Sequence, residues 1–201
     1  NLRGPANLSL NDECAFLLEG FDSPPMVMMP YNPPYYHDLM KKCGMVKAKD
    51  LYAFRIFRHS EARKDVKAIV DETVKNHSIT LRTLDFSNLD AEGEKIKYVY
   101  NNAWKKNWGF VPWTENEMDH MVRKLKQVAD PRLVIIAEDK DRPVGFAFAL
   151  PNWNEVLIKL NGRLFPFGIF KFMFYKKRIK GVRALVFGIL GEYQKTGVSY
   201  M

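Results

Sequence analysis

The sequence is poor in the residues that mark secreted and metal-binding proteins. Only two of its 201 residues are cysteines, Cys14 and Cys43, and they lack the C-x-x-C spacing of a zinc or redox site. A low cysteine content favours a reducing compartment, because disulfides are kept in oxidising ones. The first ten residues lack the basic start and apolar centre of a signal peptide. These absences predict a cytoplasmic protein without a metal cofactor.

A membrane span and the usual hydrolase motif are also missing. The longest apolar stretch, Leu164 to Tyr175, is about half as long as a bilayer-spanning helix and is interrupted by a proline, a glycine and a lysine. No serine stands in a G-x-S-x-G elbow. Metal-ligand spacing is absent from the four histidines, His37, His59, His77 and His120. The sequence therefore excludes a transmembrane helix and disfavours hydrolase and metalloenzyme functions.

Positive charge is the main compositional feature that is present. The formal net charge is +8 and the sequence pI is about 9.4. This balance favours an anionic partner, but net charge alone does not separate nucleic acid, a membrane surface and a phosphate-rich cofactor. With 47% hydrophobic residues, the chain can bury a sizeable core.

Residues 1–58 differ from the rest of the chain. Five prolines crowd into positions 24–34, so this stretch is predicted to be an ordered loop that covers apolar surface. A short helix is expected from Tyr35 to Cys43, closed by Gly44, and a strand from Asp50 to Phe57. Ser60 is the expected N-cap of a helix that links this segment to the next.

Residues 78–201 alternate strands and helices. Thr114 and Glu117 form a capping box that opens the second helix. The predicted order is a strand at 79–84, a helix from 90, a helix from 115, a hairpin of 133–137 and 144–150, a short helix at 154–160 and a strand at 182–190. The last strand is nearly all apolar, which predicts a central strand buried on both faces. The fold class is α/β, with a mixed, mainly antiparallel sheet flanked by helices.

The loop after this strand carries the functional argument. If a helix begins near Gly197, its unpaired backbone N–H groups form an anion site, and the glycine lets a phosphate approach closely. A pyrophosphate suits such a site. The alternative is an ordinary strand-to-helix turn, which a short match alone would favour.

Here the sequence resembles the GNAT superfamily of acyl-CoA-dependent N-acetyltransferases, whose signature is Arg/Gln-x-x-Gly-x-Gly/Ala after the fourth strand. Gln194 and Gly197 match, Ser199 replaces the last small residue, and Gly191 stands where many members have proline. The order of elements from residue 79 to 190 follows the family. The stretches 11–14, 20–26, 30–36 and 104–112 are similar to a group that carries two such folds in tandem.

The tandem resemblance implies a domain plan. Residues 1–58 would be the C-terminal part of a first GNAT-like unit, and residues 59–77 a linking helix. Residues 78–201 would be a second GNAT-like domain that lacks its C-terminal helix and strands. The chain is then expected to be an internal fragment of a longer protein.

The resemblance also implies an activity, namely direct acyl transfer from acetyl-CoA or another acyl-CoA to a small-molecule or peptide amine. Backbone N–H groups at Ile189 and Leu190 would polarise the thioester carbonyl. The pyrophosphate would lie on the backbone of Gln194, Lys195, Thr196, Gly197, Val198 and Ser199. Asn102 and Trp108 are the candidates for an amine pocket. No catalytic residue is assigned, because the last strand holds no carboxylate and Glu192 and Tyr193 are equally well explained as turn residues.

Two other functions stay open. The fold could serve as a catalytically inactive interaction protein. Alternatively, six aromatic residues between Phe165 and Tyr175, with neighbouring lysines, could bind a membrane surface or nucleic acid. The favoured interpretation is that these aromatics pack over the sheet while the lysines stay solvated, so both partners are disfavoured. The sequence leaves open the acceptor amine, the acyl length and the oligomeric state.

Overall fold

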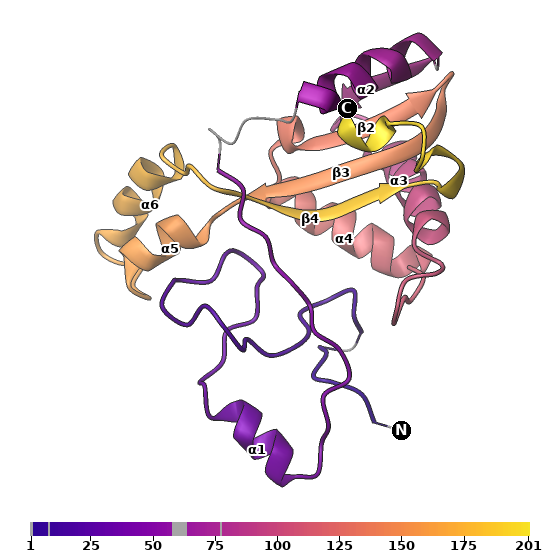
Figure 1. The fold of residues 1–201 in the computed structure, drawn as a ribbon. Helices are drawn as coiled ribbons and strands as arrows, with labels where there is room; N and C mark the ends of the chain where they lie inside the picture. Colours follow the sequence, from indigo (N-terminus) through magenta and orange to yellow (C-terminus); the bar gives the residue numbers. More distant parts are fainter. Residues whose placement is uncertain (1, 8, 58–63, 77) are drawn as a thin grey trace. The chain divides into compact units, whose positions relative to one another are not determined.

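A computed structural model describes residues 2–7, 9–57, 64–76 and 78–201 of the chain (Figure 1). They divide into two compact units. The loop-rich unit comprises Asn1–Ser60 and Asn152–Ile179, and the sheet unit comprises Glu61–Pro151 and Lys180–Met201. The expected domain plan kept residues 152–179 with the second domain, whereas in the structure this segment groups with the N-terminal residues.

The sheet unit is built on four antiparallel strands. These are β1 Ile79–Thr83, β2 Val134–Asp139, β3 Arg142–Pro151 and β4 Val182–Ile189, in the spatial order β1-β2-β3-β4. Lys140 and Asp141 turn the β2–β3 hairpin with φ angles of 49° and 72°, as a two-residue turn that matches the strand twist requires. The hairpin confirms the sequence prediction, and the α/β class with flanking helices is confirmed with it.

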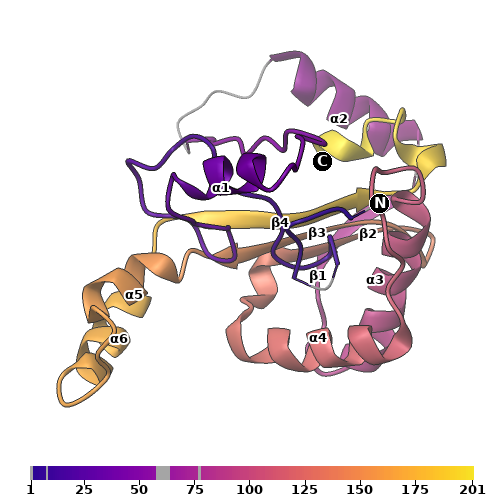
Figure 2. The same ribbon diagram turned by 90° about the horizontal axis from the view of Figure 1, so that it is seen from below.

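Helices cover both faces of this sheet. Figure 2 shows α3 Leu89–Ala103 and α4 Glu115–Val128 on one face and α2 Lys64–Asn76 on the other. The capping box that opens α4 is confirmed: Thr114 N donates to Glu117 Oε2 at 2.9 Å, and Glu117 N donates to Thr114 Oγ1 at 3.3 Å. The expected cap of the preceding helix, Ser60, lies outside the described residues.

The position of β4 differs from the prediction. Within the described sheet β4 is an edge strand with β3 as its neighbour, and its buried residues are confined to the last two positions, Gly188 and Ile189. Its apolar composition predicted a central strand. Such a strand has a neighbouring strand along each edge and packed side chains over both faces of the sheet. Among the described residues of this unit, no second strand pairs with the other long edge of β4.

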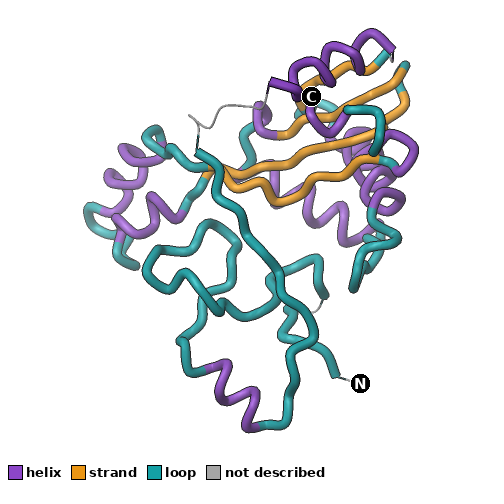
Figure 3. The backbone as a smooth tube through the Cα atoms, in the orientation of Figure 1, coloured by secondary structure: helices purple, strands orange, loops and turns teal. Residues whose placement is uncertain are grey.

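The loop-rich unit has little regular structure (Figure 3). Its helices are α1 Tyr36–Lys42, α5 Asn154–Leu160 and α6 Gly168–Lys176. The Pro-rich stretch is held by side-chain amides, since Asn152 Oδ1 accepts from Val27 N at 3.1 Å and Asn154 Nδ2 donates to Pro25 O at 2.8 Å. These hydrogen bonds explain how a segment without helix or strand can adopt one defined backbone conformation.

Two predictions for this unit were wrong. The segment 50–57 is irregular rather than a strand, and Phe54 and Ile56 are more than four-fifths exposed. A β-like sequence does not form a strand without a neighbour to pair with. The aromatic segment after residue 164 contains α6, which was not predicted, and Phe165, Phe167 and Phe170 are exposed rather than packed over the sheet.

No helix in the described part of the chain is long and apolar enough to cross a membrane.

Candidate functional site

The site is the turn that follows β4, residues 191–201. It contains two short 3₁₀ turns, Gly191–Tyr193 and Val198–Tyr200. Side chains fix the turn locally, because Gln194 Nε2 donates to Ile189 O at 3.3 Å and Thr196 Oγ1 donates to Tyr193 O at 2.8 Å. The predicted loop is therefore present, and a 3₁₀ turn stands where an α-helix was expected to begin.

Helix α2 supports this turn from one side. The buried Thr73 hydroxyl lies 2.6 Å from Thr196 O and 2.7 Å from Ile69 O. Gly197 has a φ of +89°, and a Cβ at this position would lie 2.1 Å from Thr73 Oγ1 and 2.7 Å from Ile69 Cγ2. Val198 is buried in the core next to the turn. Glycine is thus required here by conformation and by the close approach of α2.

The turn leaves backbone donors without partners. Among the described residues, the N–H groups of Gly197, Val198 and Ser199 donate no hydrogen bond, and the last two lie within a 3₁₀ turn. An open cleft of about 680 Å³ adjoins the turn and is lined by Ile69, Glu72, Thr73, Gln194, Lys195, Thr196, Gly197 and Tyr200. Successive unpaired N–H groups near a lysine suit an anion. Of these groups Gly197 lines the cleft together with Lys195, and Glu72 adds a negative charge to the lining.

The end of β4 presents one further donor. Leu190 N donates to Val144 O at 2.9 Å, so the predicted role of this N–H in polarising a carbonyl conflicts with the strand pairing. Ile189 lies opposite Gly145, next to this hydrogen-bonded pair. Neighbouring antiparallel pairs alternate, so the Ile189 N–H points to the unpaired edge of the strand. Of the two predicted positions, Ile189 is therefore the one whose N–H is not used in strand pairing.

The two predicted substrate residues lie at the end of α3 and in the connection after it. Asn102 Nδ2 donates to Tyr98 O at 2.7 Å within α3, and Trp108 is 42% exposed. The residue after Asn102, Ala103, contacts β4: its Cβ lies 3.6 Å from where a Cβ at Gly188 would stand. This end of α3 therefore lies over the end of β4. No hydrogen bond joins Asn102 to the turn in the described structure.

Glu192 and Tyr193 are engaged in local contacts. Glu192 Oε1 pairs with Arg142 Nη2 at 2.7 Å, and Tyr193 donates to Asp139 Oδ2 at 2.8 Å. The hydrogen bond to Asp139 and burial raise the pKa of Tyr193, which keeps its proton on the phenol. These contacts tie the turn to the β2–β3 hairpin, and neither residue is assigned a catalytic role.

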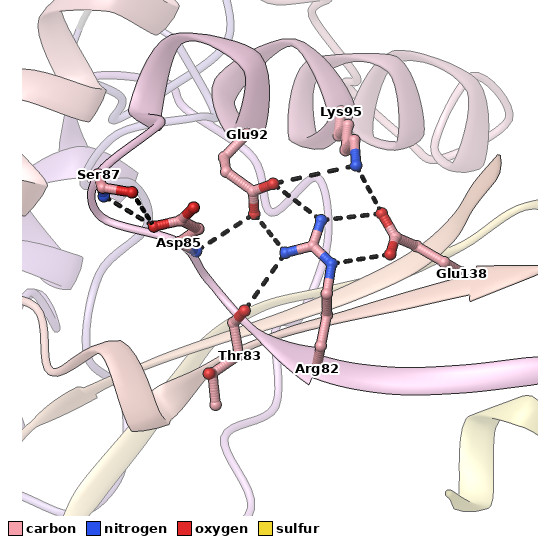
Figure 4. Close-up of polar contacts among 7 residues, drawn as sticks. All are labelled: Arg82, Thr83, Asp85, Ser87, Glu92, Lys95 and Glu138. Carbon is pink, nitrogen blue, oxygen red and sulfur yellow. Dashed lines mark hydrogen bonds and ion pairs between the residues drawn. The ribbon is translucent and has the colours of Figure 1, made fainter. Parts of the chain in front are cut away.

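A charged cluster that the sequence did not reveal joins α3 to the sheet (Figure 4). Arg82 on β1 contacts Glu138 on β2 through Nε and Nη2 at 2.7 and 2.8 Å, and Glu92 on α3 through Nη1 and Nη2 at 2.7 and 2.8 Å. Lys95 adds a 2.7 Å contact to Glu138. Both carboxylates are buried and paired. The cluster holds the helix whose far end carries Asn102.

This cluster predicts a pH dependence of stability. The Arg82 hydrogen bond, followed by that of Lys95, lowers the pKa of Glu138 from 4.5 to about 2. A carboxyl whose pKa is lower in the folded state stabilises the fold above pH 4.5 and loses that effect as the pH falls toward 2. The loss should approach about 3 kcal/mol. Urea unfolding from pH 7 to pH 2 should show a steeper loss of stability in wild type than in Glu138→Gln, which keeps only the contributions of other carboxyls whose pKa is lowered, such as Asp85, Glu117 and Asp130. Equal slopes would contradict the assignment.

Two features of the site were missed by the sequence reasoning. Ile69 and Thr73 lie more than a hundred residues before the turn that they support, and no local pattern links them to it. Arg82 lies inside the predicted strand 79–84, but Glu138 was assigned to the turn after the strand 133–137, so their pairing was not predicted. No group of three or more metal-binding side chains occurs among the described residues.

The geometry defines an α/β sheet unit with an unpaired strand edge leading into an anion-compatible turn. No family model matches the chain. Two curated proteins are similar to it. One is named bacterial ceramide synthase, from Caulobacter vibrioides (strain NA1000 / CB15N), and is 37% identical over 195 residues, which are 96% of this chain and 50% of that protein. The other is Protein YghO from Escherichia coli (strain K12), 35% identical over 197 residues, again 96% and 50%. The chain spans about half the length of these relatives.

Proposed function

We propose that this chain forms the acyl-CoA-binding part of a GNAT-like N-acyltransferase that acts on a lipid amine. The observation that carries the proposal is the run of unpaired N–H groups at residues 197–199 beside Lys195 and an open cleft. A CoA pyrophosphate needs several donors that converge on it, and backbone N–H groups provide them without side-chain entropy.

The unpaired edge of β4 suits the rest of the cofactor. The pantetheine arm of CoA contains two amide groups, and an extended amide chain can pair with a free strand edge as an added strand does. The thioester would then lie near the Ile189 N–H, which points to this edge. In this proposal the pantetheine arm lies along the edge of β4, and the pyrophosphate lies at the turn that follows the strand.

The relatives support the choice of acceptor. A ceramide is an amide of a long-chain amino alcohol and a fatty acid, so the relative named ceramide synthase forms an N-acyl bond by its name. For this chain that favours a long-chain amine as acceptor and a long acyl group over acetyl. In the proposed reaction the amine nitrogen attacks the thioester carbon. The C–N bond forms, the C–S bond breaks, the nitrogen loses a proton and CoA leaves as the thiol.

The binding site is tested by placing a negative charge at the turn without bulk at Gly197. Ser199 is exposed, so Ser199→Asp leaves the packing against α2 intact and sets a carboxylate beside the unpaired N–H groups. Repulsion of the pyrophosphate should weaken binding of acyl-CoA to the full-length protein by at least about tenfold, measured by calorimetry.

Matched variants separate charge from structure. Ser199→Asn has nearly the same shape without the charge and should bind within about threefold of wild type. Lys177→Ala removes a surface charge in the other unit and should also bind like wild type. If Ser199→Asp binds acyl-CoA as tightly as Ser199→Asn, the pyrophosphate does not lie at this turn.

A further inference from the structure

We propose that the α5–α6 hairpin of the loop-rich unit docks on the surface of an anionic lipid bilayer. Its outward side chains form the hairpin surface, which comprises Leu157, Ile158, Phe165, Phe167, Phe170 and Met173. Each of these is more than half exposed, and the three phenylalanines reach 76%, 70% and 68%. The inference does not depend on the proposed acyl transfer.

The hairpin already has an interior without these residues. Val156 is fully buried, the rings of Trp153 and Phe172 stack at 5.8 Å with 7° between their planes, and Gly168 is buried. A Cβ at Gly168 would lie 2.2 Å from Arg163 O, so the start of α6 is packed tightly on the connection. The exposed phenylalanines are therefore not needed to close the hairpin, and exposing them to water is unfavourable.

The charges around the hairpin surface are of one sign. Residues 152–179 contain six basic residues and one acidic residue, Glu155. Lys159, Lys171, Lys176 and Lys177 are exposed and have no carboxylate partner among the described residues. Apolar side chains flanked by unpaired lysines are the pattern of a segment that lies in a membrane interface, where lysines contact lipid phosphates.

The aliphatic residues of the hairpin surface favour a lipid partner over a nucleic-acid partner. Bases of single-stranded nucleic acid stack on aromatic rings, so a nucleic-acid platform needs rings along a basic groove. Leu157, Ile158 and Met173 cannot stack on bases, yet each of them is more than half exposed. They are suited to contact acyl chains, which favours the bilayer.

The test is flotation of the full-length protein with phosphatidylcholine vesicles, with and without phosphatidylglycerol. Wild type should bind more strongly when phosphatidylglycerol is present. Phe165→Ser combined with Phe170→Ser should lower the partition coefficient at least about tenfold on both vesicles, because it removes buried apolar area. Lys176→Gln combined with Lys177→Gln should lower it about fivefold per lysine, with anionic vesicles only.

Phe54→Ser combined with Phe57→Ser is the matched control, since both rings are exposed in the same unit outside the hairpin. It should float like wild type, and so should Ser199→Asp, whose defect is expected in acyl-CoA binding alone. Circular dichroism melts should show that all variants are folded. The proposal is overturned if wild type does not float, if both phenylalanine pairs behave alike, or if the hairpin pair impairs binding of a single-stranded oligonucleotide while leaving flotation unchanged.

Discussion

Replacing Gly197 by alanine is expected to destabilise the sheet unit by about 2–5 kcal/mol. Two costs add. The φ of +89° is unfavourable for any residue with a Cβ, and the new methyl group would meet Thr73 Oγ1 at 2.1 Å and Ile69 Cγ2 at 2.7 Å. Because α2 and the turn would have to separate, the hydrogen bond between Thr73 and Thr196 would be strained as well.

Gly191→Ala is the matched control for this prediction. Gly191 lies in the same turn, its φ is not in the left-handed region, and no heavy atom lies within 4 Å of a Cβ built there. Urea unfolding should place Gly191→Ala within about 0.5 kcal/mol of wild type. If Gly197→Ala is equally stable, α2 does not pack against the turn as the structure shows. Gly197 variants are therefore unsuited to testing cofactor binding, whereas Ser199→Asp avoids this clash.

Replacing Arg82 by methionine is expected to cost about 3–5 kcal/mol of unfolding free energy. Arg82 makes two contacts to each of two buried carboxylates, Glu92 and Glu138. Without it, two negative charges remain buried with Lys95 as the nearest cation. The desolvation of two buried carboxylates that share one cation costs more than the methionine side chain regains by packing.

The size of the effect can be compared with a surface pair. Arg132 pairs with Asp130 at 2.6 Å but is 85% exposed, so Arg132→Met should cost less than about 1 kcal/mol. Adding Glu138→Gln to Arg82→Met should restore part of the stability, because it removes one of the two buried negative charges and leaves Lys95 beside the other, Glu92. Similar losses for Arg82→Met and Arg132→Met would show that the cluster contributes no more than a surface ion pair.

Much of the sheet unit could be predicted because its signals are local. The Thr114–Glu117 capping box and the hairpin of residues 133–150 are set by neighbouring residues, and both formed as expected, although the strands run further into the turn than predicted. Predictions that depended on distant partners did worse. The β-like segment 50–57 has no strand beside it, and β4 has one neighbour where its composition suggested two. A hydrophobic pattern shows which residues of a segment could be buried. Whether another strand or helix packs against the segment depends on the tertiary structure.

For the candidate site, too, the local features could be predicted from the sequence and the distant contacts could not. The turn at 194–199 was located from its glycine and the preceding apolar strand, and its unpaired N–H groups follow from that backbone. The support from Thr73 on α2 is a contact between residues 123 positions apart, which no local pattern encodes. Leu190 was assigned a free N–H because the register of β3 against β4 was unknown, and that register directs the N–H of Ile189 outward instead.

The central claim is acyl transfer from CoA to a lipid amine, and one assay tests it directly. Full-length protein is incubated with a long-chain acyl-CoA and a long-chain amino alcohol, with CoA thiol followed by a thiol reagent and the lipid product by mass spectrometry. The account predicts amide product and free CoA in equal amounts, both dependent on the amine and reduced in Ser199→Asp relative to Ser199→Asn. Absence of amide at millimolar acyl-CoA from folded protein, or thiol release that does not depend on the amine, would contradict it.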